Sequence, residues 1–240
     1  MLYSLIEAMC GRALNTQLTH ERRKLWAIWT LWCAAGETIG IGLAAAIAIT
    51  AFVSEPSGLG GKLAALTAVT IGGCIEGLAV GSFQWRVLRG RLPELPWGRW
   101  TRVTVGVAAL FWVLGSFAPI MLLGGNGAEA GAASTSGPPV WLQAVIGAAG
   151  GAVAVIGFGF AQWMVLRDHA ERASRWIWIN AAGWALAMFW IMGAAGMPTP
   201  EMAAYQKILI GCAAGVLAGV SVGVITGYVV VRLEARERPA

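Results

Sequence analysis

The sequence predicts an all-α integral membrane protein with six transmembrane helices, on the basis of composition and of how the apolar residues are grouped. Of the 240 residues, 58% are hydrophobic and only 12% are charged, about half the charged share of an average soluble domain. The apolar residues form six long blocks, each near the ~20 residues that a helix needs to cross a bilayer. They lack the alternation of a transmembrane β-barrel. A soluble globule is excluded, because six such blocks leave no polar shell to cover them.

The six spans are expected in order at 25–53, 63–88, 100–123, 140–166, 176–197 and 205–231. Before them, residues 1–24 form a separate segment in which Leu2, Leu5, Ile6 and Met9 recur at helical spacing. This pattern favours a short amphipathic helix on the membrane surface, with a frayed tail as the alternative. The transmembrane domain thus covers 25–233, and a polar tail follows at 234–240.

Basic residues fall on one side of the predicted spans. Of the 17 lysines and arginines, 15 lie in the N-terminal segment, the second and fourth connections and the tail. The positive-inside rule therefore places both the N and the C terminus in the cytoplasm. The net charge of +5 is explained by this orientation and by attraction to anionic lipid, so no nucleic-acid partner is implied.

The ends of the second and fourth spans repeat one another. Gln84–Arg89 reads Gln-Trp-Arg-Val-Leu-Arg, and Gln162–Arg167 reads Gln-Trp-Met-Val-Leu-Arg; residues 227–232 are a weaker third copy that keeps an aromatic residue and the arginine. The next spans also start alike, at Arg99-Trp100 and Arg175-Trp176. We predict three parallel repeats of a two-helix hairpin, at about 25–89, 99–167 and 175–232, related by an axis along the membrane normal.

These repeated helix ends are expected to be interfacial anchors. Indole rings are favourable at the level of the headgroups, and arginine side chains reach lipid phosphates. The alternative is that the tryptophan-rich edge is a docking surface for a partner protein. The predicted anchors are Gln84, Trp85, Arg89, Gln162, Trp163 and Arg167. Eight of the 13 tryptophans fall near the same boundary: Trp26, Trp29, Trp85, Trp97, Trp100, Trp163, Trp176 and Trp178.

Glycines recur every four residues in two spans, as in a glycine zipper. Small residues let helix backbones approach closely in lipid, where no hydrophobic effect drives helices together. We expect these stripes to pack helices, either within one chain or at the seam of a homo-oligomer. They comprise Gly73, Gly77 and Gly81 in the second span and Gly211, Gly215, Gly219, Gly223 and Gly227 in the sixth.

Two carboxylates lie deep within the apolar blocks. Glu37 follows Trp26 by 11 residues, and Glu76 precedes Trp85 by 9 residues on the next helix. At a rise of ~1.5 Å per residue, both lie near the bilayer midplane. No basic residue shares that depth, so the pair is expected to hold a shared proton or a bound cation. The alternative is a structural role, in which both are protonated and hydrogen-bonded to hydroxyl or backbone groups.

No catalytic group emerges from the sequence. Both histidines, His20 and His169, fall outside the spans, which excludes an intramembrane Ser–His enzyme and axial histidine ligation within the membrane. The cysteines show no metal-binding spacing. We therefore expect no enzymatic activity, no metal and no cofactor.

The repeated hairpin end resembles that of uncharacterised bacterial multi-pass membrane proteins built from Gln-Trp-x-Val-Leu-Arg units. The resemblance covers 81–89, 159–167 and, loosely, 227–232. It implies a location in the bacterial inner membrane and carries no function with it.

Two functions from different classes fit these observations. The first is proton- or cation-linked transport, or binding of an ion or ligand, at Glu37 and Glu76. The second is a non-catalytic accessory or scaffold subunit that contacts membrane-protein partners through its glycine stripes and its tryptophan-rich edge.

Overall fold

The computed structural model describes residues 2–51, 58–117, 120–121 and 140–236, and within these residues it contains helices and no strands. Each of the six helices is long and apolar enough to cross a membrane. The predicted class, an all-α multi-pass membrane protein, is therefore confirmed. The helices are α1 (Leu2–Ala51), α2 (Gly58–Leu88), α3 (Trp97–Phe117), α4 (Val140–Leu166), α5 (Arg175–Ala195) and α6 (Ala204–Val230).

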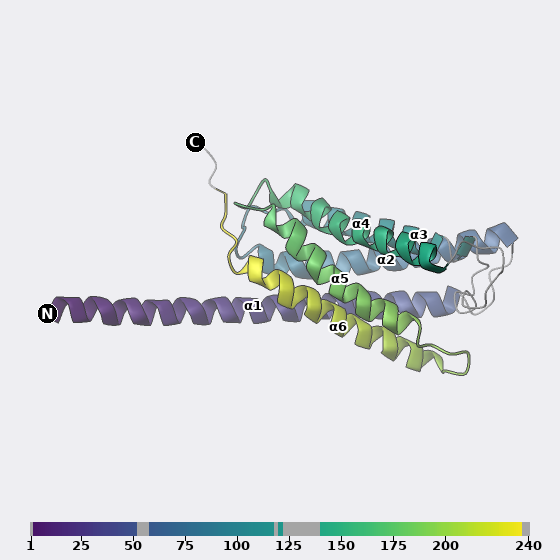
Figure 1. Ribbon diagram of the computed structural model, residues 1–240, viewed down its shortest axis with the longest axis horizontal. Coiled ribbons are helices and arrows are strands. Elements are labelled where there is room, and N and C mark those ends of the chain that lie inside the picture. The colour runs from purple at the N-terminus through teal and green to yellow at the C-terminus, as the bar shows by residue number, and fades with distance from the viewer. Residues whose placement is uncertain (1, 52–57, 118–119, 122–139, 237–240) are drawn as a thin grey trace.

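The six helices are arranged as a ring in which each packs against its neighbours in the sequence. The contact between α1 and α6 closes the ring. α6 ends at the end of the bundle from which the first part of α1 projects (Figure 1). Ring closure brings side chains of α1, α2 and α6 together, and these position the candidate site.

The segment before the first span is helical and continuous with it. α1 runs unbroken from Leu2, and its first part extends well beyond the other helices (Figure 1). The sequence favoured a separate short helix here, but no break divides the segment from the span. That this segment lies on a membrane surface stays a prediction. Of the tail, residues 237–240 lie outside the described part.

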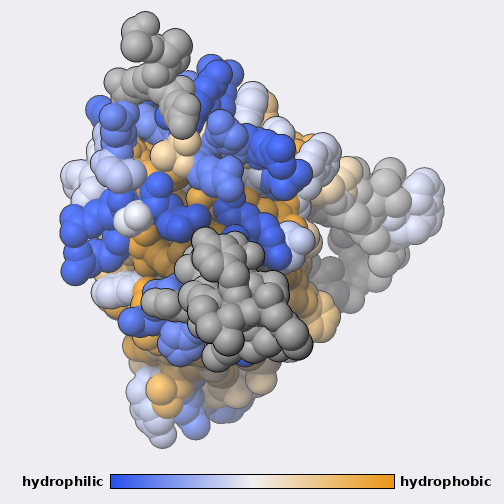
Figure 2. Space-filling view, turned by 90° about the vertical axis from the view of Figure 1, so that its left-hand side faces the viewer, coloured by the Kyte–Doolittle hydropathy of each residue, from blue (hydrophilic) through white to orange (hydrophobic). Residues whose placement is uncertain are grey.

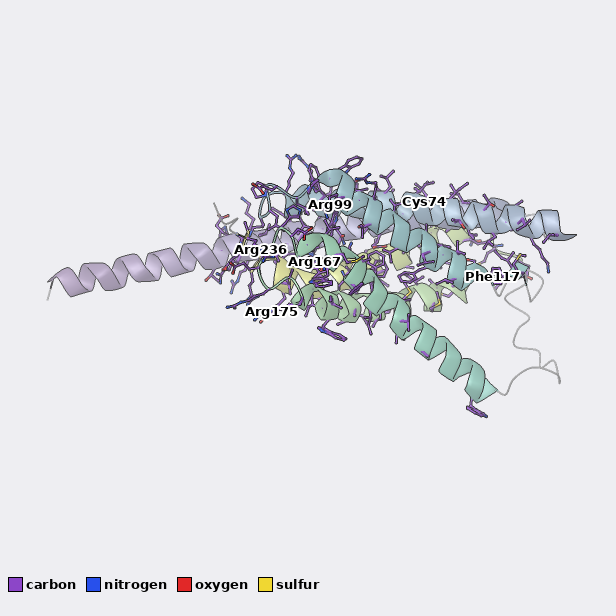
Figure 3. All side chains as sticks on the ribbon, turned by 90° about the horizontal axis from the view of Figure 1, so that it is seen from above. Cys74, Arg99, Phe117, Arg167, Arg175 and Arg236 are labelled. Carbon is purple, nitrogen blue, oxygen red and sulfur yellow. The ribbon has the colours of Figure 1, made fainter. Side chains whose placement is uncertain are left out.

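One end of the bundle is polar. Figure 2 looks onto this end and shows hydrophilic residues gathered around it, and Figure 3 shows Arg99, Arg167, Arg175 and Arg236 there, with Phe117 toward the other end. Arg99 pairs with Asp168 at 3.0 Å across two connections. Ala235 forms an antiparallel bridge with Ala170. The last described residues are thus held against the α4–α5 connection.

Three tryptophans fill the core near this polar end. Trp29, Trp100 and Trp176 come from α1, α3 and α5, and none has any exposed surface. The Trp176 ring meets Trp29 and Trp100 edge-on, at centroid distances of 6.1 and 6.0 Å. The expectation that these three lie at the lipid interface is therefore wrong. They point into the bundle because they lie on the inner faces of their helices, which sequence depth alone does not reveal.

The fourth helix is less tightly held than the others. Its first half diverges from the neighbouring helices (Figure 3). A Cβ atom added to Gly150 or Gly151 would meet no atom within 4 Å. The ring is therefore open beside the first half of α4.

Candidate functional site: a buried carboxyl pair

Glu37 of α1 and Glu76 of α2 are both buried, with exposed fractions of 1% and 6%. The two helices touch at this level, since a Cβ atom added to Gly40 would lie 2.7 Å from Glu76 Cγ. The side chains lie close enough to interact electrostatically. The structure thus brings together the two carboxyls that the sequence placed at one depth.

The two carboxyls have different surroundings. The Trp112 indole of α3 donates a hydrogen bond of 2.6 Å to Glu76 Oε2. Neither carboxyl oxygen of Glu37 has a hydrogen-bond partner among the described residues. The ion pairs formed by the described residues do not involve either glutamate. A buried carboxyl without a partner is costly unless it is protonated or faces a cation. Burial therefore costs more free energy for Glu37 than for Glu76.

Glycines make room for this arrangement on two sides. A Cβ atom at Gly73 would overlap the Trp112 ring, so only glycine lets the indole reach across α2 toward Glu76. A Cβ atom at Gly215 of α6 would lie 2.7 Å from the Glu37 carbonyl oxygen. Both stripes therefore bring a neighbouring helix close to the carboxyl pair.

The rest of the α6 stripe faces α1. Added Cβ atoms at Gly219 and Gly223 would lie 2.5 Å from Ala34 Cα and 2.6 Å from Thr30 Cα. At the ends of the stripe, Gly211 faces Ala45, and Gly227 faces Trp26. On α2, Gly77 and Gly81 approach the backbone of α3 in the same way. The backbones of α6 and α1, and of α2 and α3, approach this closely because glycine has no side chain at these positions.

A second polar cluster lies toward the arginine-rich end. Gln162 Nε2 donates to Gln84 Oε1 and to Thr104 Oγ1, both at 3.1 Å. Its Oε1 accepts from Trp176 at 3.0 Å and from Asn180 at 3.2 Å. Gln162 therefore uses both ends of its amide to join α2, α3, α4 and α5.

This cluster corrects the expected role of the two glutamines. Gln84 and Gln162 were predicted as interfacial anchors, but both are fully buried. Both glutamines lie on the face of their helix that points into the bundle. Their amides bond to each other instead of capping helix ends. The other predicted anchors lie farther out: Arg89 packs over the Trp85 ring at 5.1 Å and Arg167 over Trp163 at 5.2 Å. That these pairs anchor the protein in the membrane stays a prediction.

Cys33 links the two polar groups. Its thiol lies beside both Glu37 and Gln84. Polar side chains thus continue from Glu76 through Glu37 and Cys33 to the glutamine cluster. Several of their atoms have hydrogen-bonding capacity left: Gln84 Nε2, Trp100 Nε1, Thr101 Oγ1 and Asn180 Oδ1.

Sequence reasoning missed Trp112, Cys33 and the pairing of the glutamines. Trp112 looks like any aromatic residue of an apolar span, so no local signal marks it. The glutamines carried a usable signal, because a polar residue at the same place in two hairpins is costly in lipid unless it finds a partner. Asn180, within the first turns of an apolar block, carried the same signal.

In comparisons with protein-family models, curated proteins and solved structures, nothing matches this chain. The resemblance to bacterial multi-pass proteins therefore stays a prediction. Function is inferred from the geometry of the carboxyl pair.

Proposed function

We propose that this protein binds a proton or a cation at Glu37 and Glu76 and links that binding to transport across a bacterial inner membrane. The observation that carries the proposal is Glu37, which is 1% exposed and whose oxygens have no hydrogen-bond partner in the described part of the chain. Such a group is retained where its protonation or its pairing with a cation is used. An apolar residue would pack there at lower cost.

The two carboxyls have distinct roles in this proposal. The hydrogen bond from Trp112 favours charge on Glu76 and leaves a shared proton on Glu37. The pair then carries one negative charge in a low-dielectric site, which attracts a cation. Two neighbouring buried carboxyls both stay charged only when a cation lies beside them. Loss of the shared proton therefore goes with uptake of a cation, which couples the proton to the cation.

A route for the proton supports this function. Cys33, Gln84 and Gln162 lie between the carboxyls and the arginine-rich end. Gln84 Nε2 has no hydrogen-bond partner among the described residues and suits bridging water, which carries protons between side chains. We infer that the proton enters and leaves by this end.

We also propose the threefold hairpin repeat and cytoplasmic termini. The repeat is supported by three matching pairs at the ends of α2, α4 and α6, where Arg89, Arg167 and Arg232 pack over Trp85, Trp163 and Tyr228. The orientation is supported by the positive-inside rule, because the arginine-rich end is also the end at which α6 ends.

The test uses Glu37→Gln and Glu76→Gln in proteoliposomes with an imposed pH gradient. We expect each variant to abolish pH-gradient-driven cation flux, because an amide neither takes up a proton nor balances a cation. Infrared difference spectra between high and low pH should also lose a carboxylic C=O band in each variant.

Glu21→Gln is the matched control, since Glu21 lies on the same helix in an exposed position. It should retain both signals. Unchanged flux and unchanged infrared bands in both buried variants, with normal thermal stability, would overturn the proposal.

A second candidate function is that of an accessory subunit. It is favoured by the projecting first part of α1 and by Trp97 and Trp178, which are 48% and 68% exposed near the arginine-rich end (Figure 1). Purification from native membrane in mild detergent should then recover a partner in stoichiometric amount by mass spectrometry. A protein purified alone counts against it.

A further inference from the structure

A small, partly open space lies against Glu76, and none of the residues that line it belongs to α1. It has a volume of about 90 Å³ and is lined by side chains of α2, α3, α4 and α5. This is several times the ~10–15 Å³ that one water molecule needs and far below the ~300–1,000 Å³ of sites for drug-sized ligands. The space therefore suits a ligand of few heavy atoms.

Four of its ten lining residues are aromatic. Phe111, Trp112, Phe158 and Trp184 all line it. The Phe158 ring lies 4.5 Å from Trp184 and 6.3 Å from Phe111, measured between centroids. Aromatic rings grouped beside a carboxylate are surroundings that suit ammonium ions, because a cation is attracted to ring faces.

The composition of the wall disfavours a bare metal ion. Hard cations take six or more oxygen ligands in proteins. Among the described residues that line this space, Glu76 alone offers a side-chain oxygen. An alkylammonium ion gives up water more easily than a metal ion, and its methyl groups pack against rings.

Trp184, a residue of the same wall, carries a second polar atom. Trp184 is 4% exposed, and its indole Nε1 has no hydrogen-bond partner among the described residues. An indole N–H donates only, so its missing partner is an acceptor such as a hydroxyl oxygen. The wall thus presents an acceptor for a cation at Glu76 and a donor for a hydroxyl at Trp184.

We infer that the space beside Glu76 is a binding site for a small alkylammonium ion that carries a hydroxyl group. The ammonium lies against Glu76 and the rings of Phe111, Phe158 and Trp184, and the hydroxyl accepts from Trp184 Nε1. This inference rests on the proposed function, and it names the class of cation that the carboxyl pair exchanges for a proton.

The experiment is calorimetric titration of the purified protein in nanodiscs with three probes of similar size. Choline carries both charge and hydroxyl, tetramethylammonium carries the charge alone, and 3,3-dimethylbutan-1-ol is the neutral analogue of choline. We expect choline to bind most tightly and the neutral alcohol not to bind.

Variants assign the contacts. Glu76→Gln should weaken both cations by about tenfold or more, because it removes the opposite charge. Trp184→Phe keeps a ring and loses the donor, so it should abolish the preference for choline over tetramethylammonium. Phe158→Leu should weaken both cations several-fold. Phe160→Leu is its control, since Phe160 lies on the same helix and is 46% exposed.

The outcomes separate this inference from the proposed function. Absence of choline binding, or choline binding that Glu76→Gln leaves unchanged, overturns the ammonium site. If choline binding is absent but Glu37→Gln still abolishes the cation flux and the infrared band, the proposed function stands with another cation. Loss of the preference for choline in Trp184→Phe, with tetramethylammonium still bound, supports the site.

Discussion

At the scale of single residues, the interior of this protein is organised by a few polar side chains in an apolar bundle. Each is costly in lipid unless it is paired, so the partners identify what each one does. Gln162 is fully paired and therefore structural. Glu37 is unpaired and therefore a candidate for proton or cation binding. The difference between these two residues is the main argument for separating the glutamine cluster from the carboxyl site.

The structural role of Gln162 is tested by Gln162→Leu. The leucine leaves the indole of Trp176 and the amides of Gln84 and Asn180 without their partner. We expect a loss of about 1–3 kcal/mol in the free energy of unfolding, since buried donors are left unsatisfied. Unfolding by SDS, followed by circular dichroism in mixed micelles, measures it.

Met164→Leu is the control, because Met164 lies two residues away on the same helix and is 41% exposed. Its stability should match that of the wild type. Equal stability of the two variants would show that the glutamine cluster contributes nothing to the fold.

At the scale of helices, the glycine stripe of α6 determines how closely α1 approaches. Every glycine of that stripe faces an α1 residue of the same chain. The stripe is therefore covered, and it is not free to form the seam of a homo-oligomer. Close packing of α1 on α6 in turn places the Glu37 backbone against Gly215, which orients the carboxyl toward α2.

Gly219→Leu tests this packing. Its Cβ atom would lie 2.5 Å from Ala34 Cα and 2.6 Å from the Cys33 carbonyl oxygen, and backbone atoms on the facing helix yield little. We expect a destabilisation of about 1–3 kcal/mol from overpacking, with a lower yield of monodisperse protein. Thermal unfolding and size-exclusion chromatography measure the two effects.

Gly106→Leu on α3 is the comparison, because an added Cβ atom there would meet nothing within 4 Å. It should behave like the wild type or better, since glycine disfavours a helix. If both leucine variants are equally stable, α6 does not pack against α1 as described.

At the scale of the whole molecule, one end of the bundle gathers arginines and the α2–α3 and α4–α5 connections (Figure 3). Arg91 Nη2 donates to the Leu233 carbonyl at 2.8 Å, and Arg99 pairs with Asp168. The opposite half of the ring opens beside α4. The helices are thus held together by their connections near the arginine-rich end, and α4 diverges from its neighbours toward the other end (Figure 3).

The orientation of this arginine-rich end is testable with a fluorescent protein fused after Ala240. We expect full fluorescence, because the positive-inside rule places that end in the cytoplasm, where such fusions fold. A phosphatase that is active only outside the cytoplasm should be inactive at the same position. An active phosphatase with a dark fluorescent fusion would reverse the topology.

The sequence by itself determined the membrane class and the six apolar helices, and it predicted one depth for the two carboxylates. These depend on local hydrophobicity and on distance along a helix, which are properties of one segment at a time. It also marked Gln84 and Gln162 as repeated, but assigned them to the wrong surroundings, because spacing along the chain does not say which face of a helix turns inward.

Only the tertiary structure decided which helices meet and with which faces. The hydrogen bond of Trp112 to Glu76, the missing partners of Glu37 and the burial of Trp29, Trp100 and Trp176 all depend on the rotation of each helix about its axis. In spans that are apolar on nearly every side, no hydrophobic stripe indicates that rotation. Close contacts at glycine and the pairing of buried polar groups determine it instead, and both exist only when the helices are together.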